Sequence, residues 1–470
     1  MKIETFALVP GKETAIYKQL FDFIRENIIA GHFLPGDTLP SSRRLAVDMS
    51  ISRTSVLNAY TALIAEGYII SRKGAGYTIN THPAAHLPEA RKEEATVAIN
   101  HSRYAPFSAE PIDNSLFPVS RWAKIMSKIA RTASLSLVNT SQYDEFGNRD
   151  LREILCEYLY ESKGISCSAG QIIITTGSME SLEICINALT VPGQMLSLED
   201  PCYPLLRSYT DSQRRFIHVM PVDESGARCD TIPASSRVAI ITPGNQFPLG
   251  MTMPTQRKRE FVQWAYNNQT WIIEDDYDGD FYFNNKKAPA LAALDTHHRT
   301  IYLGSFSKLI SSEFRIAFIV VPVALLPRVS KLNYTQKASY LPQLVLSEFI
   351  RSGDFYRYLL KARNSYAEKR HFLIALLNKT LFPYGKTYGD PAGSLVVFTF
   401  SLEIDDVKVE SLAKEQGLSL RALSQFFCHE KRSGLVMGYL LFNRDTLKKA
   451  VHLLKKVLEE YSHSASVSDR

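Results

Sequence analysis

Apolar residues in the first 80 positions recur with the spacing of amphipathic helices. A first helix is predicted from Ile16 to Ala30, ended by Gly31, and its apolar stripe consists of Ile16, Leu20, Phe23, Ile24 and Ile28. A second helix is predicted to start in the run Pro40 to Ala46, where a serine supplies the cap.

A third helix is predicted to begin after Ser52, which caps it, and to end before Gly67. Its inward positions are Val56, Tyr60, Leu63 and Ile64. Two short strands follow, at residues 68–70 and 77–79, and a basic turn that contains glycine joins them. This order of elements is that of a winged helix-turn-helix, whose third helix would place its first turn in a major groove of DNA.

From about residue 107 onward the pattern changes to short apolar runs that alternate with helical periodicity. The runs rich in β-branched residues lie at 171–176, 237–243, 271–276, 300–305 and 315–321. Continuous apolar runs between helices indicate strands that are buried on both faces, which predicts a mainly parallel sheet in an α/β domain. The stretch between the two patterns has no periodicity. We therefore expect a DNA-binding domain at 12–80, a linker at 81–106 and a large domain at 107–470.

Composition narrows the class of protein only mildly. The chain has 470 residues, of which 45% are hydrophobic, and its net charge of +6 neither requires nor excludes nucleic acid. Six scattered cysteines without a C-x-x-C pair argue against a disulfide framework and against a cysteine-ligated metal site. No apolar stretch approaches the length of a membrane span, and the first residues lack the apolar core of a signal peptide. The expectation is a cytoplasmic protein without a metal site.

The basic residues of the N-terminal module favour DNA binding, although a dimerisation unit with solvated arginines would show the same helices. Residues 35–79, PGDTLPSSRRLAVDMSISRTSVLNAYTALIAEGYIISRKGAGYTI, resemble the DNA-binding domain of GntR-type bacterial regulators. The resemblance implies that this module binds a double-stranded DNA operator. The contacting residues that it implies are Arg43, Ser52, Arg53, Thr54, Ser55, Lys73 and Gly74.

Three strand ends in the large domain carry residues suited to a phosphorylated cofactor. Lys308 follows an apolar strand, where desolvation would lower the pKa of its amine, as a Schiff-base lysine requires. The turn at Gly177 and Ser178 opens a helix, and free backbone N–H groups there favour a phosphate. Asp275 ends another strand. Each feature alone has an ordinary explanation, namely a surface lysine or a simple turn, but together they supply what pyridoxal 5′-phosphate needs.

The chain from about Phe107 looks like a fold-type-I aminotransferase, and its fusion to a GntR-type domain resembles the MocR-type transcriptional regulators. The resemblance implies that Lys308 forms the internal aldimine, Asp275 pairs with the pyridine nitrogen, and Tyr277 bonds the ring hydroxyl. It implies that Tyr203 stacks on the ring and that Tyr143 reaches the phosphate of a partner subunit, which predicts a homodimer. The remaining residues that it places at the phosphate or at the hydroxyl side are Gly177, Ser178, Met179, Ser305, Ser307, Arg315, Asn245 and Gln246.

The sequence departs from the aminotransferase pattern at several positions. Met179 stands where glutamine is usual, Asn245 where histidine is frequent, and Ala317 where glycine is usual. Val436 lies near the place of the arginine that binds a substrate α-carboxylate, and Arg421 and Arg432 are the alternatives nearby.

Three functions are compatible with these features. The first is a transcriptional regulator that senses pyridoxal phosphate, or an amino-acid effector that reacts with it. The second is an active aminotransferase with an accessory DNA-binding domain, and the third is a DNA-binding protein with a cofactor-free dimerisation scaffold. The intact cofactor residues and the incomplete carboxylate site favour the first, with at most partial transamination.

Overall fold

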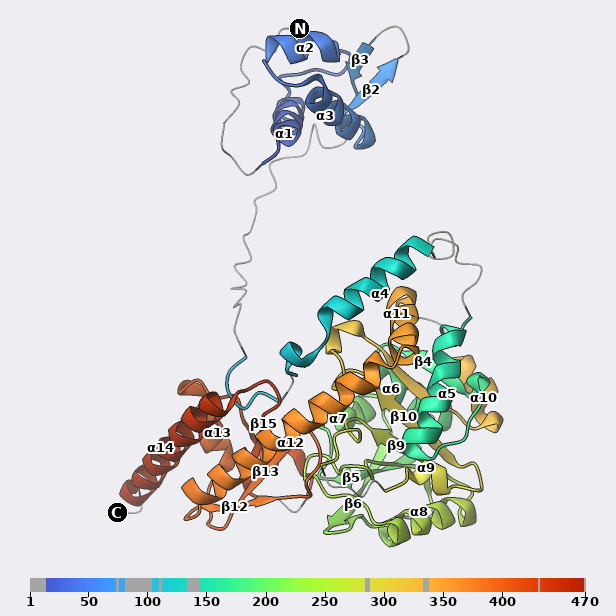
Figure 1. The fold of residues 1–470 in the computed structure, drawn as a ribbon, viewed down its shortest axis with the longest axis vertical. Helices are drawn as coiled ribbons and strands as arrows, with labels where there is room; N and C mark the ends of the chain where they lie inside the picture. The colour runs from blue at the N-terminus through green and yellow to red at the C-terminus, as the bar shows by residue number, and fades with distance from the viewer. Residues whose placement is uncertain are drawn as a thin grey trace. The chain divides into compact units, whose positions relative to one another are not determined.

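The computed structural model describes residues 14–72, 76–80, 104–109, 112–132, 144–283, 288–332, 338–429 and 432–468. The chain divides into two compact units, residues 1–100 and 101–470. Figure 1 shows both units and labels their helices and strands where there is room.

The N-terminal unit has three helices and a small antiparallel sheet. Its elements are α1 (Ile16–Ile29), β1 (Thr38–Leu39), α2 (Ser42–Asp48), α3 (Arg53–Ala65), β2 (Ile69–Arg72) and β3 (Gly76–Ile79), and the strand order is β1-β3-β2. The predicted helices and the two predicted strands are present, and β1 is an addition. Two predicted core positions are wrong: Ile16 is 39% exposed and Ile64 is 38% exposed, whereas Phe21 is buried in place of Ile16.

Short-range hydrogen bonds fix the ends of these helices. The Ser41 hydroxyl accepts from the Arg44 N–H at 3.3 Å, and the Ser52 hydroxyl accepts from the Ser55 N–H at 3.0 Å, so the predicted serine caps are confirmed. Gly67 follows α3 with a φ of +80°, a left-handed conformation that glycine adopts without strain.

The second unit contains a sheet of eight strands in the order β4-β11-β10-β9-β8-β5-β6-β7. Their bounds are β4 Ile172–Thr175, β5 Met195–Asp200, β6 Phe216–Asp223, β7 Gly226–Ala227, β8 Ser236–Ile241, β9 Trp271–Asp276, β10 Thr300–Ser305 and β11 Ala317–Val320. The five central strands from β10 to β6 are parallel, and β11 runs against both of its neighbours. The predicted α/β fold with a mainly parallel sheet is confirmed.

Helices cover both faces of this sheet. They are α5 (Arg149–Lys163), α6 (Ser178–Leu189), α7 (Pro204–Ser212), α8 (Thr255–Asn267), α9 (Leu291–Leu294) and α10 (Leu326–Ser330). Alternate residues of β4 enter different hydrophobic clusters, because Ile174 belongs with Leu155 of α5 and Ile173 with Leu182 of α6. Burial on both faces explains why the strands are apolar without alternation.

A smaller antiparallel sheet follows, in the order β12-β13-β15-β14. Its strands are β12 Gly385–Tyr388, β13 Leu395–Phe400, β14 Arg421–Ala422 and β15 Gly434–Gly438. The remaining helices are α4 (Val119–Thr132), α11 (Tyr340–Arg351), α12 (Asp354–Thr380), α13 (Asp406–Glu415) and α14 (Arg444–Ser468). In Figure 1 the long helix α12 extends from beside the large sheet to the small one. Within the part of the chain that the structure describes, no helix is long and apolar enough to span a bilayer.

Candidate functional site

Strand register brings the predicted site residues of the large domain to one edge of the sheet. Ala317 of β11 pairs with Ser305 of β10 on one side and with Thr175 of β4 on the other. Since β4 and β10 are both antiparallel to β11, they run in the same direction and end at the same edge. In open α/β sheets this edge, at the carboxyl ends of the strands, is where ligands bind.

An anion cradle lies where β4 leads into α6. Gly177 is the N-cap of α6 and Ser178 and Met179 are its first residues, so the backbone N–H groups of this turn point out of the helix. A Cβ added to Gly177 would lie only 3.3 Å from a guanidinium nitrogen of Arg315, which shows how closely that cation covers the turn. Arg315 has a φ of +49°, which is uncommon outside glycine. Helix dipole and guanidinium together favour a phosphate here.

The end of β10 contributes hydroxyl groups and the lysine. The Ser305 hydroxyl accepts from the Ser307 N–H at 3.2 Å, which fixes the turn after the strand. Lys308 is half-buried in this turn, and its Nζ donates to the carbonyl oxygen of Ala109 at 2.5 Å. The lysine therefore lies at the same edge of the sheet as the anion cradle.

Three consecutive carboxylates at the end of β9 have different surroundings. Glu274 accepts the N–H groups of Leu291 and Ala292, and Asp276 forms an ion pair with Lys163 at 2.5 Å. Successive side chains of a strand point to opposite faces, so Asp275 points away from both of these partners.

No described residue donates a hydrogen bond to the Asp275 carboxylate. Burial, with contributions from the charges of Asp276, Glu199 and Asp278, raises the pKa of Asp275 to about 7. Such a carboxylate lacks a cationic partner, and the protonated nitrogen of a pyridine ring would provide one. The donor set thus fits pyridoxal phosphate.

A buried polar cluster lies beside Tyr277. The Asn245 side-chain amide donates to the Tyr277 hydroxyl at 2.9 Å and to Asp278 at 2.8 Å, while the Asn245 Oδ1 atom is buried without a hydrogen-bond partner among the described residues. Burial raises the pKa of Tyr277 well above its ordinary value, so its hydroxyl stays protonated. An unpartnered acceptor and a neutral phenol are suited to the hydroxyl side of the cofactor ring.

Sequence reasoning missed the residues that orient this cluster. The Asp278 carboxylate accepts both the N–H and the hydroxyl of Ser394, at 2.8 and 2.9 Å, in addition to the Asn245 amide. Because Ser394 lies 116 positions further along the chain, no local pattern links the two residues.

The ring of Phe247 lies between Tyr203, the predicted stacking residue, and Tyr277. The ring of Phe247 lies 5.5 Å from Tyr203 and 5.5 Å from Tyr277, in both cases edge to face. The Tyr203 ring is 40% exposed at the start of α7. The Gln246 amide donates to the backbone carbonyls of Pro201 and Phe247, so it orients the loop that carries these rings.

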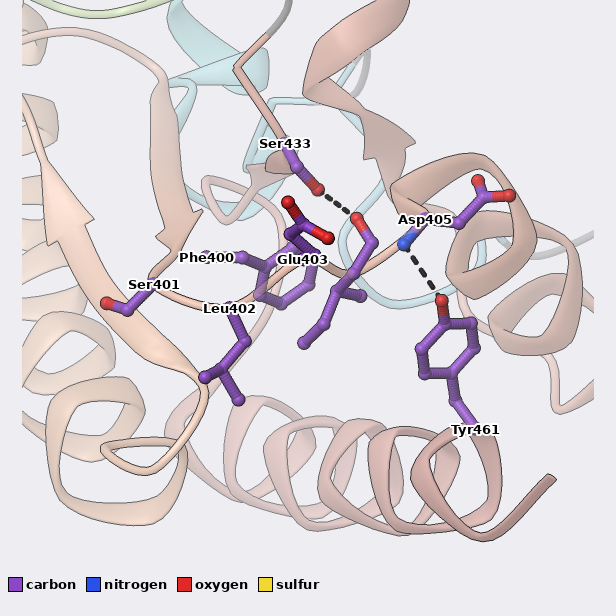
Figure 2. A pocket seen from close by; sticks show the side chains of 8 residues that line it. Phe400, Ser401, Leu402, Glu403, Asp405, Ser433 and Tyr461 are labelled. Atoms are coloured by element: carbon purple, nitrogen blue, oxygen red, sulfur yellow. Dashed lines mark hydrogen bonds between the residues drawn. The ribbon is translucent and has the colours of Figure 1, made fainter. Parts of the chain in front are cut away.

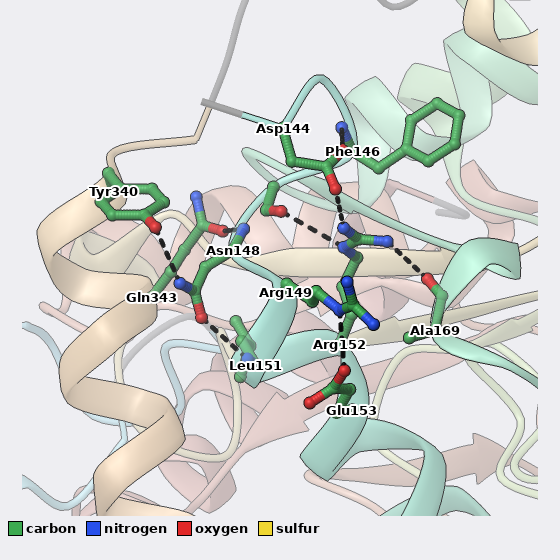
Figure 3. Close-up of polar contacts among 11 residues, drawn as sticks. Asp144, Phe146, Asn148, Arg149, Leu151, Arg152, Glu153, Ala169, Tyr340 and Gln343 are labelled. Carbon is green, nitrogen blue, oxygen red and sulfur yellow. Dashed lines mark hydrogen bonds and ion pairs between the residues drawn. The ribbon is translucent and has the colours of Figure 1, made fainter. Parts of the chain in front are cut away.

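Tyr143, predicted to reach a partner subunit, lies outside the described residues. The segment that follows it is firmly anchored (Figure 3): buried Arg152 pairs with Asp144 and donates to the Ala169 carbonyl at 2.6 Å. On the other side the Asn148 N–H donates to Gln343 at 2.7 Å.

The N-terminal unit presents most of its predicted DNA contacts at the surface. Arg43, Arg53 and Thr54 are exposed, and Arg53 is the first residue of α3. Ser52 and Ser55 bond to each other at 2.9 Å as part of the helix cap. Lys73 and Gly74 lie outside the described residues.

Comparison with known proteins agrees with both halves of this structure. Residues 16–79 match the model of the bacterial regulatory proteins of the gntR family, and residues 112–437 match that of aminotransferase class I and II. The chain is 30% identical to the HTH-type transcriptional regulator YdeL of Bacillus subtilis, over 94% of this chain and 96% of that protein. It is 29% identical to the probable rhizopine catabolism regulatory protein MocR of Rhizobium meliloti, over 94% of each chain. The chain belongs to the MocR-type transcriptional regulators.

A solved structure shares the fold of the large unit of this MocR-type regulator. It is LysN, an α-aminoadipate aminotransferase from Thermus thermophilus complexed with N-(5′-phosphopyridoxyl)-L-leucine, with a TM-score of 0.70 and 22% identity. The match covers 77% of this chain and 93% of that chain. The regulator therefore joins a GntR-type DNA-binding domain to a domain with the fold-type-I aminotransferase fold.

The two arginines near Val436 differ in their contacts in this MocR-type regulator. Arg421 lies opposite Val436 in the small sheet, and its guanidinium forms an ion pair with Glu410 of α13 at 3.1 Å. The guanidinium of Arg432 lies 6.0 Å from the ring centre of Tyr388.

A separate opening of about 590 Å³ lies between the end of β13 and α14 (Figure 2). There the Tyr461 hydroxyl accepts from the Asp405 N–H at 3.0 Å, and the Ser433 hydroxyl donates to the Ile404 carbonyl. Among the described residues that line it, Glu403 and Asp405 are acidic and none is a cation. This opening is therefore unsuited to a phosphate.

Proposed function

We propose that the aminotransferase-like domain of this regulator binds pyridoxal 5′-phosphate covalently at Lys308. The bound cofactor, either alone or after reaction with an amino-acid effector, then controls how the GntR-type domain binds DNA. The observation that carries this proposal is the partly buried Asp275 carboxylate, to which no described residue donates a hydrogen bond, at the strand end next to the one that bears Lys308. A carboxylate without a hydrogen-bond donor destabilises the folded domain, and a cation beside it would remove this cost.

Each group of residues has a separate task in the proposed site. Ser178, Ser305, Ser307 and Arg315 hold the phosphate, with the N–H groups of Gly177 and Met179. Asn245 and Tyr277 orient the hydroxyl side of the ring, and Tyr203 covers its face. When bound, the cofactor supplies a reactive carbonyl and an electron-withdrawing ring.

We further propose that steady transamination is weak or limited to one half-reaction. The support is that Arg421 already pairs with Glu410, so a substrate α-carboxylate would have to compete with an ion pair at 3.1 Å. Multiple turnover with an amino acid and a keto acid, measured on purified protein, tests this: sustained turnover would favour an active aminotransferase instead.

For DNA binding we propose a homodimer that presents two winged domains to a pair of half-sites. The exposed Arg43 and Arg53 would contact phosphates or base edges. Operator binding should then weaken steeply as salt concentration rises. The alternative of a cofactor-free scaffold predicts the same salt dependence but no response to the cofactor.

The decisive experiment is reduction of the purified protein with borohydride in the presence of pyridoxal phosphate, followed by peptide mass spectrometry. The expected result is a pyridoxyl adduct on Lys308, together with visible absorbance that Lys308→Ala abolishes. Lys386→Ala, which changes an exposed lysine of β12, is the matched control and should leave both signals unchanged. No adduct, or an adduct at another lysine, would refute the proposal.

A further inference from the structure

Two cysteines from distant parts of the chain meet beside the cofactor site. Cys202 lies between β5 and α7, and Cys428 lies between β14 and β15 of the small sheet. The two thiols influence each other, because Cys202 lowers the pKa of Cys428 while Cys428 raises that of Cys202. Cys202 is buried and Cys428 is partly exposed, so the second of the two is open to reagents from solvent.

Three backbone N–H groups donate hydrogen bonds that hold the two loops together around this pair. The Cys202 N–H donates to the Phe426 carbonyl at 3.1 Å. In return the N–H groups of Cys428 and His429 donate to the two carboxylate oxygens of Asp200 at 2.7 and 3.0 Å. These bonds hold the loop that carries Cys202 beside the loop that carries Cys428.

A cation activates one sulfur of the pair. The Arg207 guanidinium donates to the Cys428 Sγ atom at 3.1 Å and to the Phe427 carbonyl at 3.3 Å. Hydrogen bonds from Cys202 and Arg207 lower the pKa of the Cys428 thiol below its ordinary value, against the effect of burial. A thiolate that is partly exposed and lies next to a second thiol is the arrangement of redox-active cysteines.

We propose that Cys428 and Cys202 form a redox-active pair that a hydroperoxide oxidises to a disulfide. The Cys428 thiolate attacks the peroxide, an S–O bond forms as the O–O bond breaks, and the leaving oxygen takes a proton from solvent. The Cys202 sulfur then attacks the oxidised Cys428 sulfur, the S–S bond forms, and the hydroxyl leaves as water with the Cys202 proton. The two thiols lose two electrons, and the peroxide is reduced to an alcohol or water.

The pair is connected to the cofactor site by direct contacts. Cys202 precedes Tyr203, whose ring contacts Phe247, and Phe247 in turn contacts both Tyr277 and Phe426 at ring-centre distances of 5.5 and 5.6 Å. A disulfide would therefore fix the small-sheet loop against the residues that cover the cofactor. This consequence rests on the proposed function, whereas the oxidation itself does not.

The chain contains its own control for this chemistry. Cys156 and Cys167 have their sulfur atoms 4.0 Å apart, but burial raises the pKa of both thiols. If proximity alone decided oxidation, both pairs would react. If the Arg207 contact decides it, only the Cys202–Cys428 pair will react.

In the test, reduced full-length protein is treated with a small excess of hydrogen peroxide at pH 7. The remaining thiols are then blocked, and disulfides are mapped by peptide mass spectrometry without reduction. Cleavage after lysine, arginine and glutamate isolates Cys202 in residues 200–207 and Cys428 in residues 422–430. The expected product is the crosslink between these two peptides, formed at least tenfold faster than a crosslink between residues 154–157 and 164–180, which hold the control pair. Equal rates, or no crosslink between Cys202 and Cys428, would overturn the proposal.

Two variants and one binding measurement complete the design. Arg207→Gln should slow alkylation of Cys428 by iodoacetamide at pH 7 about tenfold, because the thiolate loses its cationic donor; an unchanged rate would contradict the role of Arg207. Cys428→Ser should abolish the crosslink. The affinity for pyridoxal phosphate, measured by titration, should differ at least threefold between oxidised and reduced protein. Equal affinities would refute an effect of the disulfide on the cofactor site, but not the formation of the disulfide.

Discussion

Replacing Asp275 with asparagine in the cofactor-free protein tests how the candidate site is built. The wild-type carboxylate is partly buried beside other acids, and no described residue donates a hydrogen bond to it, so its charge destabilises the folded state. Asparagine has nearly the same shape and no charge. We therefore expect Asp275→Asn to be more stable than the wild type near neutral pH, although it should bind pyridoxal phosphate less tightly.

The pKa of Asp275 rises from an ordinary value of 3.8 to about 7 in the folded protein. Between these two values the folded state retains a proton that the unfolded state has released, so the stability that this group contributes is full below pH 3.8 and falls as pH rises to about 7. At about 1.4 kcal/mol per pH unit, the whole loss is on the order of 4 kcal/mol, as an upper bound. Part of this loss of stability has already occurred at pH 5. The difference in unfolding free energy between Asp275→Asn and the wild type should therefore grow by roughly 2–3 kcal/mol between pH 5 and pH 8.

Urea unfolding at both pH values, followed through the transition of the aminotransferase-like domain, measures this change. Asp230→Asn is the control, because Asp230 is exposed, pairs with Arg228 at 2.5 Å and has a lowered pKa. It is ionised at both pH values, so its effect should not depend on pH in this range. An effect of Asp275→Asn that is equal at pH 5 and pH 8 would show that the carboxylate is solvated or paired, and the reasoning for the site would fail.

Three further predictions concern other parts of the chain. Arg53→Ala should weaken binding to an operator fragment about tenfold and lower the salt slope by about one, measured by fluorescence anisotropy at several salt concentrations; an unchanged slope would exclude a phosphate contact. Ser52→Ala should destabilise the N-terminal domain by about 1 kcal/mol, because the Ser55 N–H loses its cap. Thermal unfolding of that domain measures this, and an unaltered melting temperature would contradict it. Lys163→Met should cost about 3–5 kcal/mol in urea unfolding, because it leaves Asp276 buried without its cation, and a cost below about 1 kcal/mol would mean that water replaces the lysine.

Local chemistry made much of the fold predictable from sequence. The apolar runs that became β4, β8, β9, β10 and β11 are buried on both faces, and such runs differ in pattern from amphipathic helices. Ser41 and Ser52 were identifiable as caps because a cap bonds within three residues. The sequence also predicted that the candidate site residues lie at one edge of the sheet, since parallel strands end together.

Long-range pairing decided what the sequence did not predict. Strands β1 and β14 have two residues each, and they exist only because β3 and β15 lie beside them. The exposure of Ile16 depends on which side of α1 meets α3, which the helical period alone does not fix. In the site, Asn245, Asp278 and Ser394 form one hydrogen-bonded cluster from three separate segments.

Two carboxylates with raised pKa values in the candidate site offer a physical basis for regulation. Burial raises the pKa of Glu199 to about 7, as it does for Asp275, and the two carboxylates interact. A ligand can shift a conformational equilibrium only by binding one state more tightly than the other. A cofactor that brings a cation to Asp275 gains this interaction only where the site is assembled, so its binding should favour the assembled state. A smaller rise in the unfolding free energy on addition of pyridoxal phosphate to Asp275→Asn than to the wild type would identify the carboxylate as a source of this preference.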